Sequence, residues 1–141
     1  MLDVCLTDDL ATCHALRRVV FIEEQNVDEA LEVDGQDAAA LHVLARLDGL
    51  PVGCARILIM GDTAKIGRVC VLRDHRGKGI GQALMRKAVE ILAQNPEVRR
   101  AKLGSQVHAM AFYAGLGFQP MGDVYMEAGI AHRDMVCDLS A

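Results

Sequence analysis

A predicted strand, a glycine-rich turn and a predicted helix follow one another between positions 63 and 94, and this stretch constrains the fold most. An apolar run at 66–72 leads into Arg76-Gly77-Lys78-Gly79-Ile80-Gly81. Beyond the turn, apolar residues recur at three- and four-residue spacing, which predicts a helix with one buried face. Such a helix start presents unpaired backbone N–H groups at the positive end of the helix dipole. The stretch therefore predicts an anion site, most naturally for phosphate.

Three phosphate-binding motifs compete for this turn. A Walker A loop needs Ser or Thr directly after its lysine, but Gly79 follows Lys78, so that motif is excluded. The dinucleotide pattern needs a third glycine at position 82, which is Gln82, so a nucleotide-dependent dehydrogenase ranks last. Arg76-x-x-Gly79-x-Gly81 resembles the signature with which acetyltransferases of the GNAT superfamily hold the pyrophosphate of acetyl-CoA. A glycine-rich surface turn without a ligand is the alternative for this motif alone.

Length and composition narrow the class of protein. The 141 residues suffice for one domain, and 52% of them are hydrophobic but only 4% aromatic, which predicts an aliphatic core. The net charge of −4 does not favour a nucleic-acid-binding surface. The five cysteines are scattered, which indicates buried thiols in a reducing compartment rather than a disulfide framework or a metal site. No signal peptide or membrane-length apolar run is visible, so we expect a cytoplasmic protein without a membrane partner.

The remaining pattern predicts an α/β domain with a mixed sheet. We expect a strand at 2–6, a helix from Asp8 to about Glu24 capped by Thr7, and strands at 41–47 and 52–60 joined by an Asp48-Gly49 hairpin. The central strand at 66–72 and helix come next, then a strand at 101–106 reached by a right-handed parallel crossover. A short helix at 108–115 and strands beginning at 117 and 134 complete the chain. The acidic segment 23–37 is either a solvated connector or a rim over a substrate site.

A second motif strengthens the resemblance. Ala109-x-x-Phe112-Tyr113-x-x-x-Gly117-Phe118 matches a segment that GNAT enzymes carry after their fifth strand, and the tail from 122 to 135 resembles the ElaA/YjcF subgroup. The resemblance covers nearly the whole chain. It implies a single GNAT domain over 1–141, with about four helices and about seven mostly antiparallel twisted strands. In that fold strands 4 and 5 are parallel and splayed, and the pantetheine arm of CoA enters the gap.

The activity implied is N-acetyl transfer from acetyl-CoA to a primary amine, by direct transfer in a ternary complex. The family pattern assigns the leaving-group acid to Tyr113, whose phenol has an ordinary pKa near ~10. A packed helix tyrosine is the structural alternative. Unpaired backbone N–H groups near the splayed strand would hold the acetyl oxygen and pantetheine amides. The implied CoA-binding residues are Val69, Val71, Arg76, Gly77, Lys78, Gly79, Ile80 and Gly81.

At the position of the general base, this sequence differs from some GNAT enzymes. Histone-acetylating members place a glutamate on the fourth strand, but the corresponding position here is Lys65. His132 is the candidate base, because imidazole accepts protons near neutral pH. Glu127 is the second candidate, directly or through a water.

The acceptor is the least defined part of the prediction. Arg17 and Arg56 are candidates for binding an anionic acceptor, and His42 for lining the acceptor cleft. For the two arginines a plain surface position is the alternative. We expect a small-molecule amine as acceptor, acetyl-CoA as co-substrate and no metal; the resemblance adds a homodimer as one option for the oligomeric state. An acyl-CoA-binding sensor without efficient turnover is the alternative function.

Overall fold

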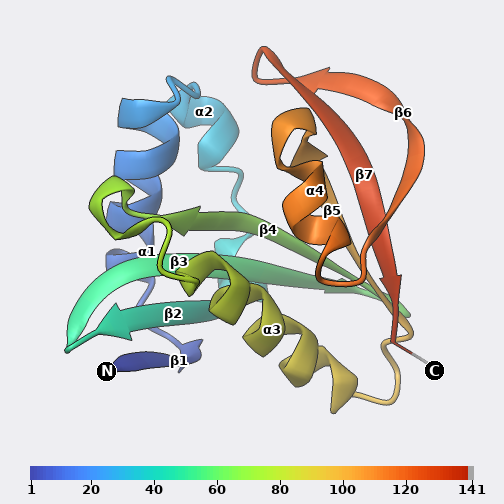
Figure 1. Ribbon diagram of the computed structural model, residues 1–141, viewed down its shortest axis with the longest axis horizontal. Helices are drawn as coiled ribbons and strands as arrows, with labels where there is room; N and C mark the ends of the chain where they lie inside the picture. The colour runs from blue at the N-terminus through green and yellow to red at the C-terminus, as the bar shows by residue number, and fades with distance from the viewer. Residues whose placement is uncertain (140–141) are drawn as a thin grey trace.

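The computed structural model describes residues 1–139 and shows one seven-stranded mixed sheet with the strand order β1-β2-β3-β4-β5-β7-β6 (Figure 1). Only β4 and β5 pair in parallel. The strands are β1 (Leu2–Thr7), β2 (Leu41–Leu47), β3 (Leu50–Met60), β4 (Thr63–Val71), β5 (Arg100–Gln106), β6 (Gln119–Glu127) and β7 (Ile130–Asp138). The α-helices are α1 (Leu10–Arg17), α2 (Glu29–Glu32), α3 (Ile80–Ala93) and α4 (Met110–Ala114). The predicted fold class is confirmed; residues 140 and 141 of the predicted domain lie outside the described part.

The first helix differs from its prediction in its N-terminal cap and in the type of its last turns. The predicted cap, Thr7, accepts a hydrogen bond from the Asp9 backbone N–H, while the Asp9 carboxylate accepts from the Thr12 N–H at 3.1 Å and caps α1. After α1 the chain continues as a π-helical segment (Arg18–Glu24), so the helical stretch does reach Glu24 as predicted. The capping error arose because three consecutive residues, Thr7, Asp8 and Asp9, carry side-chain acceptors, and the local backbone path selects the third.

The β2–β3 hairpin follows directly from its turn residues. Asp48 and Gly49 both have positive φ, 51° and 84°, as the tight hairpin turn requires. The predicted strand at 66–72 is β4, which begins three residues earlier. The last predicted strand is β7, which begins at Ile130 rather than at 134, because a second tight turn at Ala128-Gly129 pairs its first residues, 130–132, with 127–125 of β6.

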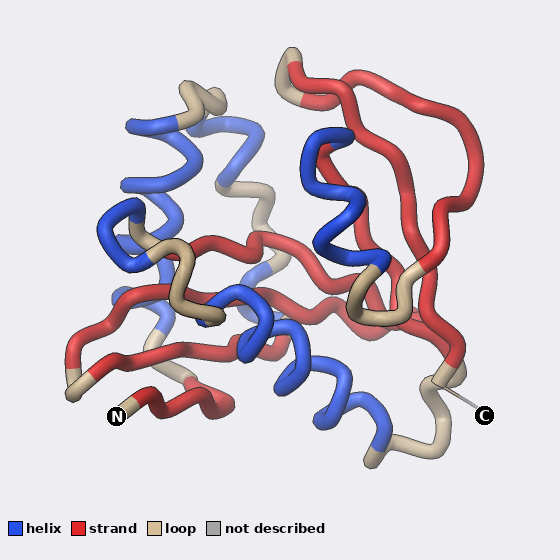
Figure 2. The backbone as a smooth tube through the Cα atoms, in the orientation of Figure 1, coloured by secondary structure: helices blue, strands red, loops and turns tan. Residues whose placement is uncertain are grey.

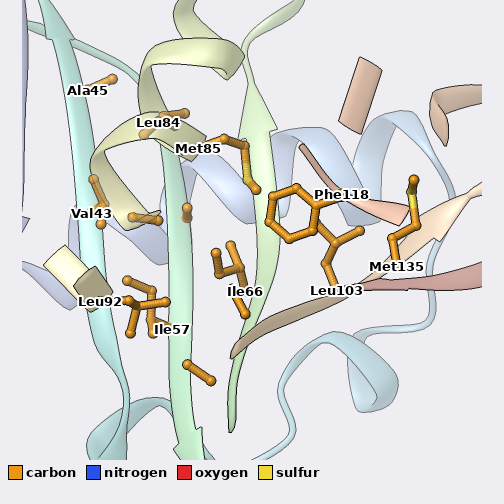
Figure 3. Packing of buried hydrophobic residues seen from close by; sticks show 14 of the residues in the cluster. Val43, Ala45, Ile57, Ile66, Leu84, Met85, Leu92, Leu103, Phe118 and Met135 are labelled. Carbon is orange, nitrogen blue, oxygen red and sulfur yellow. The ribbon is translucent and has the colours of Figure 1, made fainter. Parts of the chain in front are cut away.

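Helices cover both faces of the sheet. Successive side chains of a strand point to opposite faces, so apolar residues on both faces need a helix to cover them. In β2, Val43 and Ala45 join the cluster under α3, whereas Leu44 joins the cluster under α1. The backbone tube in Figure 2 shows the helices and strands of this arrangement in the orientation of Figure 1. The predicted buried face of α3 is confirmed for Ile80, Leu84, Ala88 and Leu92, while Ile91 is only partly buried. Figure 3 shows this aliphatic core together with Phe118 and Met135.

The cysteines are all free, and three of the five are buried, as predicted. Cys13, Cys54 and Cys70 lie in the smaller cluster under α1, and the Cys54 and Cys70 sulfur atoms are 3.6 Å apart. The two others are partly exposed. No helix within residues 1–139 combines the length and the apolar character needed to cross a bilayer.

β4 and β5 separate soon after they meet, and this separation positions the site. Their parallel pairing is limited to residues 63–65 with 100–102. Further along, β4 stays with β3 and β5 stays with β7, so the two halves of the sheet diverge (Figure 1). The splaying that the resemblance implied is therefore present, and backbone groups on the facing edges of β4 and β5 lack strand partners.

Candidate active site

A cavity of about 350 Å³ occupies the gap between the diverging strands. Its wall contains five of the residues predicted to act in catalysis or binding: Val69, Tyr113, Glu127, His132 and Arg56. They come from β4, α4, β6, β7 and β3, segments up to 76 positions apart in sequence. The fold therefore brings the predicted acid and both predicted bases to one cavity.

The tautomer of His132 is defined by its hydrogen bond. Its Nδ1 lies 2.7 Å from the Ile130 carbonyl oxygen, and because a carbonyl only accepts, Nδ1 must carry the proton. In the neutral ring Nε2 is then left with a free lone pair. Nε2 lies 3.8 Å from Glu127 Oε2, too far for a direct hydrogen bond. The ring is only 8% exposed and stacks on Tyr125, with centroids 5.9 Å apart. His132 is thus held with a proton-accepting nitrogen available.

Tyr125 also holds the neighbouring wall in place, a role that the sequence did not suggest. Its hydroxyl donates a 2.7 Å hydrogen bond to the Asp134 carboxylate, which also pairs with Lys102 at 3.3 Å. Burial and this hydrogen bond raise the pKa of Tyr125. The phenol therefore stays protonated and keeps its ring stacked against His132.

Tyr113 lies on α4 between two aromatic rings. It makes edge-to-face contacts with Phe112 and Phe118, with centroids 5.0 and 6.4 Å away. Burial raises the pKa of the Tyr113 phenol above its ordinary value. Its hydroxyl makes no hydrogen bond to any other described residue, so its proton is free to be donated into the cavity.

The glycine-rich turn forms the N-terminus of α3. Gly77 and Gly79 both have φ of 79°, and a Cβ at either position would meet no atom within 4 Å, so the turn is open on its outer side. No side chain within residues 1–139 caps the helix, which leaves the first N–H groups of α3 without partners. The Ile80 side chain is buried in the core, so only its backbone is available. This geometry fits the diphosphate of CoA.

Arg76 is held beside this turn by residues from two other segments. Its two terminal nitrogens lie 2.6 and 2.8 Å from the Glu24 carboxylate, and its Nε donates to the Val71 carbonyl at 2.9 Å. The hydrogen bond with Arg76 lowers the pKa of Glu24 and raises that of Arg76. The turn is thus tied to the end of the first helical stretch.

The edge of β4 provides further donors. Leu72, which follows β4, donates its N–H to Val52 of β3 at 2.8 Å. Because N–H groups alternate between the two edges of a strand, the Val71 N–H points to the other edge, toward β5. A bulge near Arg68, whose φ is 52°, interrupts the pairing just before Val69. Val69 thereby lines the cavity, as the prediction requires.

Two predicted acceptor-site residues lie elsewhere. Arg17 is 1% exposed and does not line the cavity; its guanidinium contacts Glu32 at 2.8 Å and Asp37 at 2.8 Å. His42 also lies outside the cavity, with Nε2 2.9 Å from the Asp37 carbonyl oxygen. Both predictions of acceptor contact are corrected: these side chains are occupied by the segment that follows the first helical stretch.

Arg56 lines the cavity, but its charge is also engaged. Its terminal nitrogens pair with Asp34 at 2.8 Å and with Asp37 at 3.2 Å. Arg68 adds hydrogen bonds from Nη2 to the carbonyls of Leu31 and Glu32. The acidic segment is therefore no solvated connector, since arginines from three elements bury two of its carboxylates.

A pair of glutamines on the cavity wall was not predicted, because no sequence motif marks it. Gln106, at the end of β5, donates to Gln25 at 3.1 Å, and both residues line the cavity. His108 Nε2 lies 2.6 Å from the Gln106 side-chain oxygen. Residues 81 positions apart meet here only because the strands splay.

Comparison with known proteins agrees with this geometry. A family model described as an acetyltransferase (GNAT) domain matches residues 10–139. Protein ElaA of Escherichia coli is 38% identical over 125 residues, covering 85% of this chain and 81% of ElaA. YjcF of Bacillus subtilis, described as an uncharacterized N-acetyltransferase, is 31% identical and covers 93% of this chain and 94% of its own.

Solved structures give the same result. The crystal structure of Escherichia coli ElaA superimposes with a TM-score of 0.87 at 32% identity, covering 97% of this chain and 99% of ElaA. An acyl-CoA N-acyltransferase from Pseudomonas aeruginosa does so with a TM-score of 0.88 at 30% identity, over 97% and 99% of the two chains. The predicted ElaA/YjcF relationship is confirmed, and the chain belongs to the GNAT acetyltransferase family of acyltransferases.

Proposed function

We propose that this protein is an acetyl-CoA-dependent N-acetyltransferase that acts on a primary amine of a small molecule, by direct transfer in a ternary complex. One observation carries the proposal: the gap between β4 and β5 opens into a cavity lined by both Tyr113 and His132. A cytoplasmic location and a homodimer stay predictions from the sequence.

The residues present suit CoA on physical grounds. The uncapped N–H groups of α3 and the open glycines offer donors to a diphosphate, and Lys78 places a positive charge in the same turn, while the charge of Arg76 is shared with Glu24. The Val71 N–H, which by strand alternation from the Leu72–Val52 hydrogen bond would face the gap, would suit a pantetheine amide. When bound, acetyl-CoA supplies an acetyl thioester that an amine can attack.

Two side chains would move the protons. His132 Nε2 would take a proton from the acceptor nitrogen, while the Ile130 carbonyl keeps Nδ1 protonated and the ring oriented. Tyr113 would give its proton to the leaving sulfur, and the raised pKa of its phenol keeps that proton in place at neutral pH. Glu127, near Nε2, would stabilise the imidazolium that results.

Replacing Tyr113 by Phe tests the proposal. The substitution keeps the ring contacts with Phe112 and Phe118 but removes the proton donor. We expect kcat to fall by about 100-fold, a typical contribution of a general acid. Thiol release from acetyl-CoA in the presence of amines measures turnover, and calorimetry with acetyl-CoA measures binding.

The two measurements separate an enzyme from an acyl-CoA sensor. An enzyme loses turnover in Tyr113→Phe and keeps its affinity for acetyl-CoA. Binding without turnover in the unmodified protein, over a broad set of amines, would instead support a sensor. Absence of binding would refute the proposal altogether.

A further inference from the structure

The charged residues of the cavity wall are not equally available to a ligand. Three arginines, Arg17, Arg56 and Arg68, face three carboxylates, Glu32, Asp34 and Asp37, in one cluster beside the cavity. Formal charges in this cluster cancel. Its members on the cavity wall, Arg56, Arg68 and Glu32, are therefore already compensated.

Lys65 is the cation on the cavity wall without such compensation. It lies on β4 and is exposed, and it makes no ion pair with any carboxylate of residues 1–139. The nearby Asp134 carboxylate is already bound by Lys102 at 3.3 Å and by the Tyr125 hydroxyl at 2.7 Å. An ammonium left in this position favours a ligand with a negative group.

The part of the cavity wall formed by β6 and β7 carries negative charge instead. Glu127 is exposed, carries a negative charge and lies 3.8 Å from His132 Nε2. An ammonium group entering the cavity is attracted to this carboxylate and can lose a proton to the imidazole. The cavity is thus bipolar, with an amine-binding side on β6 and β7 and an anion-binding side on β4.

The distance between the two sides limits the shape of the ligand. Lys65 is in register with Lys102 of β5, and His132 is in register with Gln106, four residues further along the same strand. Four residues of strand span about 13 Å. Part of the wall is aliphatic: Val27, Leu31, Leu58, Ile66, Leu103 and Ile130. This arrangement suits a molecule with an apolar spacer between its charged ends.

We propose that the acceptor is an aliphatic amine carrying an anionic group at its far end, of the ω-aminocarboxylate class. This inference rests on the proposed function, and Lys65 is its specificity-determining residue. In the reaction the acceptor nitrogen forms an amide bond to the acetyl carbon and the thioester C–S bond breaks. The acceptor, which enters as an ammonium, loses two protons: the first passes through His132 Nε2 to solvent, and Nε2 receives the second as the amide bond forms. The sulfur leaves as a thiol with the proton of Tyr113, and the proton held by His132 then returns through solvent to the Tyr113 phenolate, so that one proton is released overall.

Matched acceptors test the inference with the unmodified protein. The probes are ε-aminocaproate, n-hexylamine and hexamethylenediamine, which share an aliphatic primary amine but differ at the far end; L-alanine tests the spacer. We expect kcat/KM for ε-aminocaproate to exceed that of each other probe by about tenfold, the worth of one charge-assisted contact. Thiol release gives the rates, and mass spectrometry identifies the acetylated product.

Reversing one charge provides a result that unfolding cannot imitate. In Lys65→Glu we expect the preference to invert, with hexamethylenediamine becoming better than ε-aminocaproate. In Lys65→Gln the preference is expected to fall to about one, because the charge alone is removed. Lys87→Glu makes the same charge change on α3, outside the cavity wall, and is expected to keep the original preference.

Failure of the inference differs from failure of the proposed function. If the diamine or hexylamine is the better substrate of the unmodified protein, or if Lys65→Glu keeps the preference for ε-aminocaproate, the inference is wrong and the acetyltransferase proposal stands. If no probe is acetylated and acetyl-CoA does not bind, both are wrong.

Discussion

The Nδ1 hydrogen bond of His132 decides which of the two predicted bases has the better geometry. It leaves Nε2 unprotonated in the neutral ring, inside a wall that also contains Tyr113. The Glu127 carboxylate is far more exposed and lies 3.8 Å from Nε2. At the scale of single residues, these contacts support our proposal that His132 is the base and Glu127 its electrostatic partner.

This assignment predicts different pH profiles for two variants. In His132→Gln we expect kcat/KM to fall by about 100-fold, with loss of the decline toward acid that protonation of a base produces. Glu127→Gln is expected to cost less than about tenfold and to keep that decline. Steady-state rates between pH 5 and 9 measure both. If kcat/KM no longer declines toward acid pH in Glu127→Gln but still declines in His132→Gln, Glu127 is the base.

Residues predicted for the site from a motif share one cavity wall in the structure, and their catalytic roles stay predictions. Tyr113, Glu127 and His132 all lie on the cavity wall, although nothing local in the sequence shows that they meet. Arg17 and His42 lie outside it, because both bind the segment at 32–37. Those partners are set by tertiary packing, and the sequence pattern of a charged run does not reveal them.

At the scale of elements, the arginine–carboxylate cluster fixes the segment that lines the cavity. Burial disfavours ionisation of Asp37, but hydrogen bonds from Arg17, His14 and Arg56 outweigh it and lower the pKa of its carboxyl. The cluster links α1, the segment at 32–37, β3 and β4. A charged run that looks solvent-exposed in the sequence is therefore a structural connection.

Removing the Asp37 charge is expected to destabilise the fold. Asp37→Asn should lower the free energy of unfolding by about 3 kcal/mol at pH 7, because it removes the carboxylate that Arg17 and Arg56 share and leaves each buried guanidinium with one carboxylate instead of two. Since the folded-state pKa is below the ordinary value near ~3.9, this stabilisation is complete above that value and is lost as the pH falls below it. The difference from the unmodified protein should shrink between pH 5 and pH 2.

Denaturant titrations at several pH values measure this difference. Asp48→Asn is the matched control, since it makes the same chemical change in an exposed ion pair with the chain's amino terminus and should alter stability little. Equal effects of the two substitutions at pH 7 would contradict a structural role for the cluster.

Helices and strands with strong local sequence signals were predicted well, but the residues at which several of them begin or end were not. The Asp48-Gly49 pair was sufficient to predict the β2–β3 hairpin, and the amphipathic pattern was sufficient to predict α3. The cap at Asp9, the π-helical turn after Arg17 and the early start of β7 were not predicted. Each depends on backbone geometry or strand pairing that a single sequence does not encode locally.

At the scale of the whole molecule, the splayed sheet places the proposed diphosphate-binding turn and the cavity with Tyr113 and His132 along the same gap. The turn at 76–81 lies at the N-terminus of α3, and the proton-transfer residues line the gap next to β4. The family motifs predicted this architecture, including the parallel but separating β4 and β5. The charge distribution inside the cavity was not predicted, because it depends on which ionic side chains the fold pairs with one another.

Hydrogen–deuterium exchange with and without CoA tests the central claim most directly. If the diphosphate is held by the start of α3 and the pantetheine arm by the free edge of β4, CoA should slow exchange at the amides of 69–71 and 79–82. Amides of the β2–β3 hairpin turn, at 48–50, should exchange at an unchanged rate. Binding of CoA that protects neither of the first two segments would contradict the account.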